Sequence, residues 1–299
     1  MAFFELIKVM IIGLVEGITE WLPISSTGHM LLLDQVLKLD SNPKFKEMFF
    51  VVIQLGAIIA VIYMYWDKLW PFRIVKPGDE KRKKTKKDAK WKNEYRFGSI
   101  GVSRPIINLW SKVLVATIPA AVIGLLLDDW MDKYAHTAGV IAVALIVYGI
   151  LFILIEDRNQ KRKPRVTKLG QITYKDALMM GGFQTLAIVP GTSRSGSSIV
   201  GGLTIGFSRR VAAEFSFFMG IPIMFGWSVV KLIKFGFHYS VLEFFEIIFG
   251  MVVAFVVSVV VIKFLMGYIK KNNFKIFGYY RIALGLIVII IFAIKGLMS

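Results

Sequence analysis

The sequence predicts an all-α polytopic membrane protein with about six transmembrane helices and two re-entrant helical hairpins related by an inverted-topology repeat. Hydrophobic residues make up 56% of the 299 residues, which is too apolar for a water-soluble protein with an ordinary surface. Six apolar stretches are bounded by charges, and two more are interrupted by proline and small hydroxyl residues. We therefore expect a single integral membrane domain over residues 1–299.

The six charge-bounded stretches are the predicted membrane spans. Several are shorter than the roughly 20 residues that a span needs, so flanking Lys, Arg and Trp side chains are expected to reach the interface. The N-terminus lacks the basic region and small-residue cleavage site of a signal peptide, so its apolar segment is expected to stay in the mature protein. The predicted spans are residues 48–66, 113–127, 134–155, 215–230, 247–262 and 282–294.

The charges between the spans predict the orientation of the chain. Loops 71–107, 157–175 and 263–281 are basic, which places them in the cytoplasm. The connection after Leu127 carries Asp128, Asp129 and Asp132 against one lysine, which places it outside together with both termini. The net charge of +17 thus reflects topology and possible lipid contact in these loops, and no nucleic-acid partner is expected. In loop 71–107 the basic residues are Arg73, Lys76, Lys81, Arg82, Lys83, Lys84, Lys86, Lys87, Lys90, Lys92, Arg96 and Arg104.

Segments 3–37 and 174–207 are the two interrupted apolar stretches. Proline disfavours helix at the residue before it, so helices are expected to end at Leu22 and at Val189. Unwound backbone is tolerated at membrane depth only when it is buried in protein or lines a wet cavity. Both segments are therefore interpreted as re-entrant hairpins. One starts outside and the other inside, so their tips can meet.

The two halves of the chain resemble each other weakly. A shift of 167 residues aligns Pro23 with Pro190 and Glu47 with Glu214, and it also aligns Ser25 with Thr192 and Ser26 with Ser193. Equal spacing of both breaks and of the following acid predicts an inverted repeat, with repeat 1 at about 1–133 and repeat 2 at about 173–299.

The first hairpin carries ionisable and hydroxyl side chains at membrane depth. Glu16 and Glu20 share a helix face, which suggests a divalent-cation site or a general base; the alternative is a structural pair at an interface. Ser25, Ser26 and Thr27 begin the second half-helix, where they can cap it, bind phosphate, or do both. His29 lies one turn further along, where it is a candidate catalyst or a core histidine.

The second hairpin places an arginine among glycines and hydroxyls. Arg194 offers a planar fork for phosphate oxygens, or it could pair with Glu16 or Glu20 for structural reasons. The candidate substrate-binding neighbours are Gly191, Thr192, Ser193, Ser195 and Gly196. Weaker candidates are Glu47, Gln54 and Glu214, since these side chains could equally be helix-end partners of Lys46 or Arg210.

The motifs resemble the signature segments of the bacterial undecaprenyl-diphosphate phosphatase family. They read Glu-Gly-Ile-Thr-Glu-Trp-Leu-Pro-Ile-Ser-Ser-Thr-Gly-His from residue 16 and Pro-Gly-Thr-Ser-Arg-Ser-Gly from residue 190. The resemblance implies a multi-pass enzyme of the bacterial plasma membrane that converts undecaprenyl diphosphate to the monophosphate lipid carrier of cell-wall synthesis. It also implies a divalent metal, an active site facing the outer leaflet, and a link with bacitracin resistance. Loop 71–107 is more lysine-rich than this family usually shows.

The resemblance assigns roles to single residues. It implies that Glu16 and Glu20 hold Mg or Ca, while Arg194 neutralises charge on the transferred phosphoryl group. Ser26 is the first choice as nucleophile with Glu20 or His29 as base, and direct attack by His29 is the second choice. A lipid-phosphate flippase with the same inverted-repeat architecture remains a rival, and the sequence leaves a homodimer open.

Overall fold

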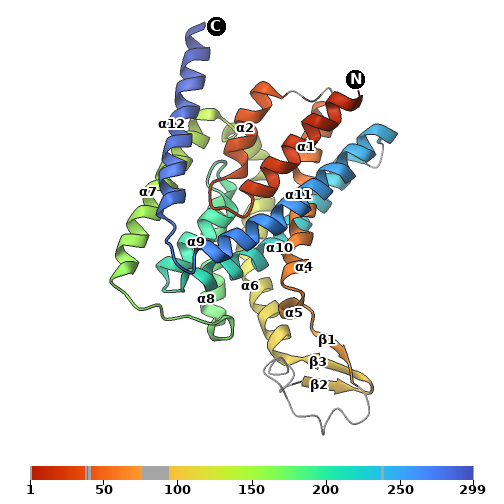
Figure 1. Ribbon diagram of the computed structural model, residues 1–299, viewed down its shortest axis with the longest axis vertical. Coiled ribbons are helices and arrows are strands. Elements are labelled where there is room, and N and C mark those ends of the chain that lie inside the picture. The colour runs from red at the N-terminus through yellow and green to blue at the C-terminus, as the bar shows by residue number, and fades with distance from the viewer. Residues whose placement is uncertain (1, 38, 40–41, 76–93, 237–238, 299) are drawn as a thin grey trace.

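The computed structural model describes residues 2–37, 39, 42–75, 94–236 and 239–298, most of them in α-helices (Figure 1). Two short 3-10 helices, η3 (Leu169–Gln171) and η4 (Leu186–Ile188), join longer ones. The α-helices are α1 (Ala2–Thr19), α2 (Ser26–Val36), α3 (Pro43–Val52), α4 (Gln54–Met64), α5 (Trp66–Leu69), α6 (Arg104–Tyr134), α7 (Ala138–Gln160), α8 (Tyr174–Thr185), α9 (Arg194–Thr204), α10 (Arg209–Phe235), α11 (Val241–Tyr268) and α12 (Lys275–Met298).

Six helical stretches are long and apolar enough to cross a membrane, and each contains most of one predicted span. They begin earlier or end later than predicted because polar end turns continue the helices beyond the apolar residues. The third predicted span began too early, since α6 continues to Tyr134 and α7 starts at Ala138. The six stretches are Lys44–Met64, Arg104–Leu127, Ala138–Gln160, Arg209–Phe235, Val241–Tyr268 and Lys275–Lys295.

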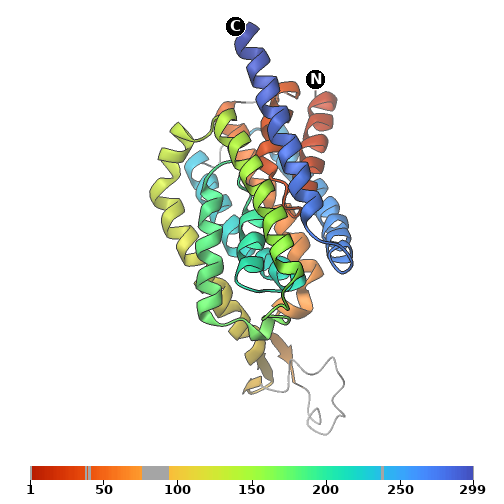
Figure 2. The same ribbon diagram turned by 90° about the vertical axis from the view of Figure 1, so that its left-hand side faces the viewer.

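Both interrupted segments form pairs of helices joined by a turn. Figure 1 and Figure 2 show α1 running inward from the end of the molecule that carries both termini, and α2 returning to that end. The pair α8 and α9 approaches from the opposite end, so the two turns lie together in the middle. The first helix of each pair ends at Thr19 and at Thr185, which is earlier than the predicted ends at Leu22 and Val189. The residues in between form the turn that leads to the cap of the second helix.

Small residues allow neighbouring helices to approach closely. A Cβ atom on Gly17 of α1 would lie 2.9 Å from the carbonyl oxygen of Ala254 in α11. A Cβ atom on Gly149 of α7 would lie 2.7 Å from the carbonyl oxygen of Gly278 in α12, and the reverse contact has the same length. Such glycine contacts are typical of helix packing in membranes. They hold α1 against α11 and α7 against α12.

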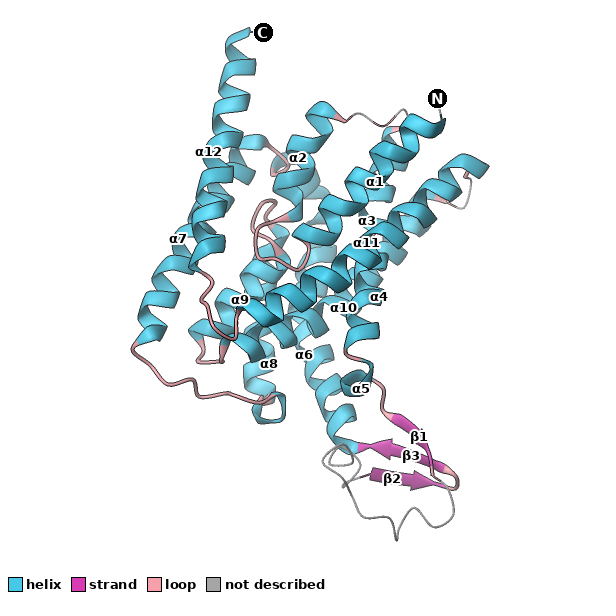
Figure 3. Cartoon of the chain, in the orientation of Figure 1, coloured by secondary structure: helices cyan, strands magenta, loops and turns pink. Residues whose placement is uncertain are grey.

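A small antiparallel sheet lies within loop 71–107, so the prediction of an all-α protein was wrong there (Figure 3). Its strands are β1 (Phe72–Ile74), β2 (Glu94–Phe97) and β3 (Ile100–Ser103), in the order β1-β3-β2. Burial alone would raise the pKa of Glu94, but hydrogen bonds from Arg73 (2.9 Å) and Arg96 (2.8 Å) outweigh it and lower that pKa. The lysine-rich part of the loop, residues 76–93, lies outside the described residues.

Candidate functional site

The last turn of α1 and the turn that follows it carry both candidate acids. The amide of Glu20 donates to the carbonyl of Glu16 over 3.0 Å, so the helical geometry continues as far as Glu20. Both side chains are buried, and both line one cavity of about 800 Å³. Carboxylate Oε1 of Glu16 has no hydrogen-bond partner among the described residues. An unpartnered buried carboxylate oxygen facing a cavity is available to a ligand.

Two strained serines begin the returning helices α2 and α9. Ser25 has φ 74° and accepts a hydrogen bond from the amide of Gly28, while Ser193 has φ 70° and accepts one from Gly196. Non-glycine residues in this region cost on the order of 1–3 kcal/mol each and cluster at functional sites. The two caps are 168 residues apart rather than 167, because the second turn has one more residue between proline and cap.

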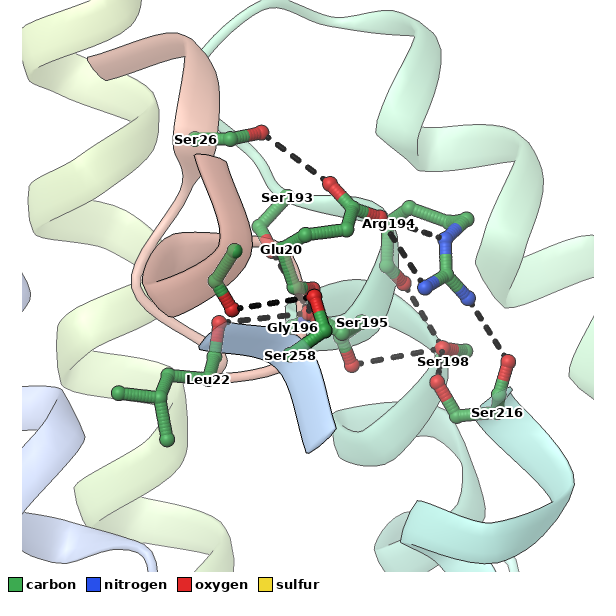
Figure 4. A network of polar contacts seen from close by, with 11 residues as sticks. Glu20, Leu22, Ser26, Ser193, Arg194, Ser195, Gly196, Ser198, Ser216 and Ser258 are labelled. Atoms are coloured by element: carbon green, nitrogen blue, oxygen red, sulfur yellow. Dashed lines mark hydrogen bonds and ion pairs between the residues drawn. The ribbon is translucent and has the colours of Figure 1, made fainter. Parts of the chain in front are cut away.

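Glu20 joins the two turns through its side chain (Figure 4). Its Oε1 accepts hydrogen bonds from Arg194 Nη2 at 3.1 Å and from Nε at 3.2 Å. Its Oε2 accepts one from the Ser26 hydroxyl at 3.3 Å. The sequence-based prediction that acid and guanidinium meet at the tips is thus matched by the geometry. One carboxylate contacts both the candidate nucleophile and the candidate phosphate-binding cation.

Arg194 is held in place on its other sides. Nη1 donates to the carbonyl of Ser216 over 2.7 Å, and the guanidinium lies 5.4 Å from the centre of the Trp21 ring. Gly220 makes room for it, since a Cβ atom there would lie 2.7 Å from Arg194 Cζ. The hydroxyl of Ser195 donates to the carbonyl of Glu20 over 3.0 Å, which ties the turns together through the backbone as well.

The candidate residues divide into two groups by position. One group lines the cavity: Glu16, Glu20, Ser26, Thr27, Gly191, Ser193 and Arg194. The other group is buried behind it and serves the turns: Ser25, Thr192, Ser195 and Gly196. The rest of the cavity wall is largely apolar, and it includes Ala120, Ala121 and Gly124 of α6 and Pro222, Ile223 and Trp227 of α10.

His29 faces away from this group. Its Nδ1 lies 2.7 Å from the carbonyl of Ser25, which can only accept, so Nδ1 is a donor there. Its Nε2 lies 2.7 Å from the hydroxyl of Tyr280, and the two rings are stacked 5.6 Å apart. His29 is not among the residues that line the cavity in the described part of the chain. Its catalytic role therefore stays a prediction without support from the geometry.

The weaker candidates have identifiable partners. Glu214 accepts from Arg210 at 3.0 Å, as considered from the sequence, and also from Lys68 at 2.7 Å. Glu47 lines the cavity but pairs with Lys231 of α10 rather than with Lys46. Gln54 also lines the cavity.

Arg281 is a structurally central residue that the sequence reasoning missed. Its side chain is fully buried and donates to the carbonyls of Pro23 (3.2 Å), Gly191 (2.8 Å) and Thr192 (2.9 Å). It therefore holds both turns at once. In the sequence, Arg281 is a charged residue in the second turn of an apolar span, which could have indicated a functional role. Because a basic loop precedes it, it was instead interpreted as one of the charges at the membrane interface.

Gln184 was also missed. It is buried, it lines the cavity, and neither its amide nitrogen nor its amide oxygen has a partner among the described residues. It lies 168 residues after Glu16, the same interval that separates the two strained caps. In the sequence, Gln184 is a single amide within an apolar hairpin. This position predicts that it lies at membrane depth, but it does not indicate a particular chemical role.

Two carboxylates, Glu16 and Glu20, are the residues that could hold a divalent metal. Mg²⁺ is usually bound by one or two carboxylates together with substrate phosphates, so Glu16, which lines the cavity and has an oxygen without a partner among the described residues, fits such an ion. No group of three or more His, Cys, Asp or Glu that could bind a metal occurs within the described ranges. A metal here would therefore depend on substrate oxygens to complete its coordination.

The chain is similar to known proteins along nearly its whole length. Residues 9–287 match the family model described as bacitracin resistance protein BacA. The chain is 53% identical to an undecaprenyl-diphosphatase of Enterococcus faecalis over 98% of this chain and 99% of that protein. It is 52% identical to one of Desulfitobacterium hafniense over the full length of both, and 51% identical to one of Acetivibrio thermocellus over 96% of this chain and 98% of that protein. The chain therefore belongs to the BacA family of bacitracin resistance proteins.

Proposed function

We propose that the chain hydrolyses the terminal phosphate of undecaprenyl diphosphate, giving undecaprenyl phosphate and inorganic phosphate and so recycling the lipid carrier of cell-wall synthesis. The relatives named undecaprenyl-diphosphatase support this reaction for the membrane enzyme and do not favour a flippase. The single observation that carries the proposal is the Glu20 carboxylate, which contacts Ser26 and Arg194 at the polar end of a largely apolar cavity.

Ser26 is the proposed nucleophile and Glu20 its base. The Ser26 proton passes to Glu20 Oε2, 3.3 Å away, as Oγ forms a bond to the terminal phosphorus. The bond from that phosphorus to the bridging oxygen breaks, and undecaprenyl phosphate leaves. Water then attacks the phosphorus of the phosphoserine and the bond from phosphorus to Oγ breaks. Oγ recovers its proton from Glu20, and both protons of the water leave with the inorganic phosphate. This order is favoured over His29 as base because His29 faces Tyr280.

Arg194 and the starts of α2 and α9 provide the positive end of the site. Arg194 donates to Glu20 in the free protein, and its planar fork can transfer to phosphoryl oxygens when the substrate enters. That transfer leaves Oε1 of Glu20 free and places positive charge where negative charge develops. Helix N-termini favour phosphate groups for the same electrostatic reason. Together these groups account for phosphoryl transfer by electrostatic stabilisation.

We propose that Glu16 and Glu20 hold Mg²⁺ or Ca²⁺ against the diphosphate. The ion would neutralise phosphate charge when bound. Glu16 is the stronger ligand candidate, because its Oε1 has no partner among the described residues even before substrate enters, whereas Oε1 of Glu20 becomes free only when Arg194 transfers to the substrate.

The proposed membrane arrangement has two re-entrant hairpins, α1–α2 and α8–α9, related by an inverted repeat. Three observations support the repeat. Each hairpin has a strained serine as the cap of its second helix, and each places a polar side chain, Glu16 or Gln184, in the cavity wall. In addition, Glu47 and Glu214, near the starts of the helices that follow, each form an ion pair, with Lys231 and Lys68. The cavity also reaches Met131 and His136, beside the connection whose charges predict an outside location. We therefore place the site toward the outer leaflet of the plasma membrane, with both termini outside.

Phosphate release from undecaprenyl diphosphate by detergent-solubilised protein tests the proposed function. We expect turnover in the wild type, a loss of about 10²-fold or more in Ser26→Ala, and ordinary turnover in His29→Gln. Ser111→Ala is the matched control, because its hydroxyl bonds Tyr174 outside the cavity. Equal rates in Ser26→Ala and Ser111→Ala would overturn the assignment of Ser26. Absence of phosphate release by the wild type would overturn the proposed function.

A further inference from the structure

A second pocket, which shares no lining residue with the cavity at the two turns, lies where three candidate spans have their ends. It has a volume of about 360 Å³, and its wall includes Met64, Arg210 and Lys263. Met64 ends one span, Arg210 lies in the first turn of another, and Lys263 lies in the last turns of a third. The pocket is therefore at the depth where a membrane-spanning helix meets the lipid headgroups.

The pocket is basic. Four basic side chains (Lys68, Arg210, Lys263 and Lys270) and two acidic ones (Asp67 and Glu214) line it, which leaves a net charge of +2. Glu214 is buried, and its two oxygens accept from Lys68 at 2.7 Å and from Arg210 at 3.0 Å. This acid is thus neutralised, and it fixes the positions of two cations that are themselves partly exposed.

Lys263 and Lys270 supply the charge that is not compensated. Both are exposed, and neither has an ion pair or a hydrogen bond within the part of the chain that the structure describes. Lys263 lies in the last turns of α11 and Lys270 in the turn that follows this helix, and both line the pocket. The ammonium groups of Lys263 and Lys270 lie in the same pocket as Lys68 and Arg210, whose positions Glu214 fixes. Together these four cations can bind an anion that has several oxygen atoms.

The surroundings favour a lipid headgroup as the source of that anion. Met64, Met266 and Gly267 give the pocket an apolar part. Trp66 and Trp70, at the two ends of the short helix α5 that carries Lys68, are half-exposed and stacked 4.5 Å apart, and Tyr63 is 66% exposed on the preceding turn. Exposed Trp and Tyr side chains at a helix end are typical of the membrane interface, and basic pockets between helices bind anionic headgroups there.

We propose that this pocket binds a phosphate-bearing anion, namely the headgroup of an anionic phospholipid, through Lys263 and Lys270 together with Lys68 and Arg210. The site is separate from the cavity between the two turns and does not depend on the phosphatase reaction. Inorganic phosphate has the same chemistry without acyl chains, so it serves to distinguish the two sources of the anion.

Native mass spectrometry of the detergent-solubilised full chain, titrated with phosphatidylglycerol or phosphatidylcholine, tests the proposal. The test variant is Lys263→Gln/Lys270→Gln. The matched control is Lys161→Gln/Lys163→Gln, which removes the same charge from an exposed loop outside the pocket. We expect phosphatidylglycerol to bind the wild type and the control equally, and the test variant about 30-fold more weakly, since each lysine near a headgroup contributes about one factor of five. The single variant Lys270→Gln is expected to bind about 5-fold more weakly.

Competition with inorganic phosphate and thermal unfolding measurements complete the test. Displacement of phosphatidylglycerol by millimolar inorganic phosphate from the wild type, and not from the test variant, supports the same anion site with free phosphate as a second source. Thermal unfolding midpoints are compared so that a loss of fold is not mistaken for a loss of binding. Equal phosphatidylglycerol affinity in wild type and test variant, or an equal loss in the control, would overturn the proposal. So would equal affinity of the wild type for phosphatidylcholine.

Discussion

Replacing Arg281 with lysine removes the contact that holds both turns of the site. The guanidinium donates to three carbonyls of the turns, at Pro23 in one and at Gly191 and Thr192 in the other. A lysine keeps the charge but has a single nitrogen, which cannot reach carbonyls on two separate turns in the geometry of the planar fork. Arg281→Lys therefore tests whether the position of the turns limits catalysis.

The expected magnitude follows from the lost hydrogen bonds and from backbone strain. Losing two bonds from a charged donor costs about 3–6 kcal/mol, which corresponds to a fall of roughly 6–12 °C in the unfolding midpoint at about 2 °C per kcal/mol for a chain of this size. Ser25 and Ser193 together hold strain of about 2–6 kcal/mol, which is similar in size. We expect the turns to relax once the arginine is gone. A displacement of about 1 Å in a catalytic group costs about 10²-fold in kcat.

The assay measures kcat and KM for phosphate release well below the unfolding midpoint of each variant. Arg209→Lys is the matched control: Arg209 makes three hydrogen bonds to buried Glu156, away from the cavity. Both variants should be less stable. Only Arg281→Lys should lose about 10²-fold in kcat, with KM changed by less than about threefold. Ordinary kcat in Arg281→Lys, or the same loss in Arg209→Lys, would refute the positioning role.

Three further substitutions have expected outcomes in the same assay. Arg194→Lys should lower kcat by about 10² or more, because a point charge cannot reproduce the fork; near-normal turnover would exclude a role in charge stabilisation. Glu16→Gln should raise the Mg²⁺ concentration needed for half-maximal rate by about tenfold after EDTA treatment, and an unchanged requirement would remove Glu16 from the metal site. Gln184→Leu should lower kcat/KM by about tenfold with little change in the unfolding midpoint, since its amide has no partner to lose among the described residues; unaltered kcat/KM would mean that Gln184 does not contact substrate.

The membrane helices were largely predictable from the sequence, since hydropathy and charge report directly on a lipid environment. All six predicted spans correspond to long apolar helices, and both interrupted segments are helix pairs with a turn near the expected proline. The helix ends were less predictable. Leu22 was expected to end the first helix, but the regular helix stops at Thr19, because turn geometry and not proline alone decides the boundary.

The pairing of Glu20 with Arg194 was predictable from topology. The sequence predicted hairpins that enter from opposite sides, whose tips can meet, and an acid and an arginine at membrane depth are expected to pair, with Glu16 and Glu20 both open as the partner. The roles of Arg281 and Gln184 were not predictable in this way. Each lies in an unremarkable local sequence, and its importance arises from distant backbone or from a cavity formed by several helices.

The local sequence did not predict the direction of the His29 side chain or the presence of the small sheet. His29 lies one turn after Ser26, but the direction of its side chain is fixed by Tyr280, 251 residues away along the chain. The strands β1, β2 and β3 have only three or four residues each, and they flank a lysine-rich stretch whose charge predicts a cytoplasmic loop and gives no sign of a sheet. Short strands are specified by their pairing partners more than by their own composition.

A double-mutant cycle between Glu20 and Arg194 tests most directly whether the two turns form one catalytic site. The rates of Glu20→Gln, Arg194→Lys and the double variant are compared with the wild type, with phosphate release from undecaprenyl diphosphate as the readout. Residues that act as one unit are strongly non-additive, so the double variant should be about as slow as the slower single variant. If the two losses instead multiply, the turns contribute independently and the shared site is contradicted.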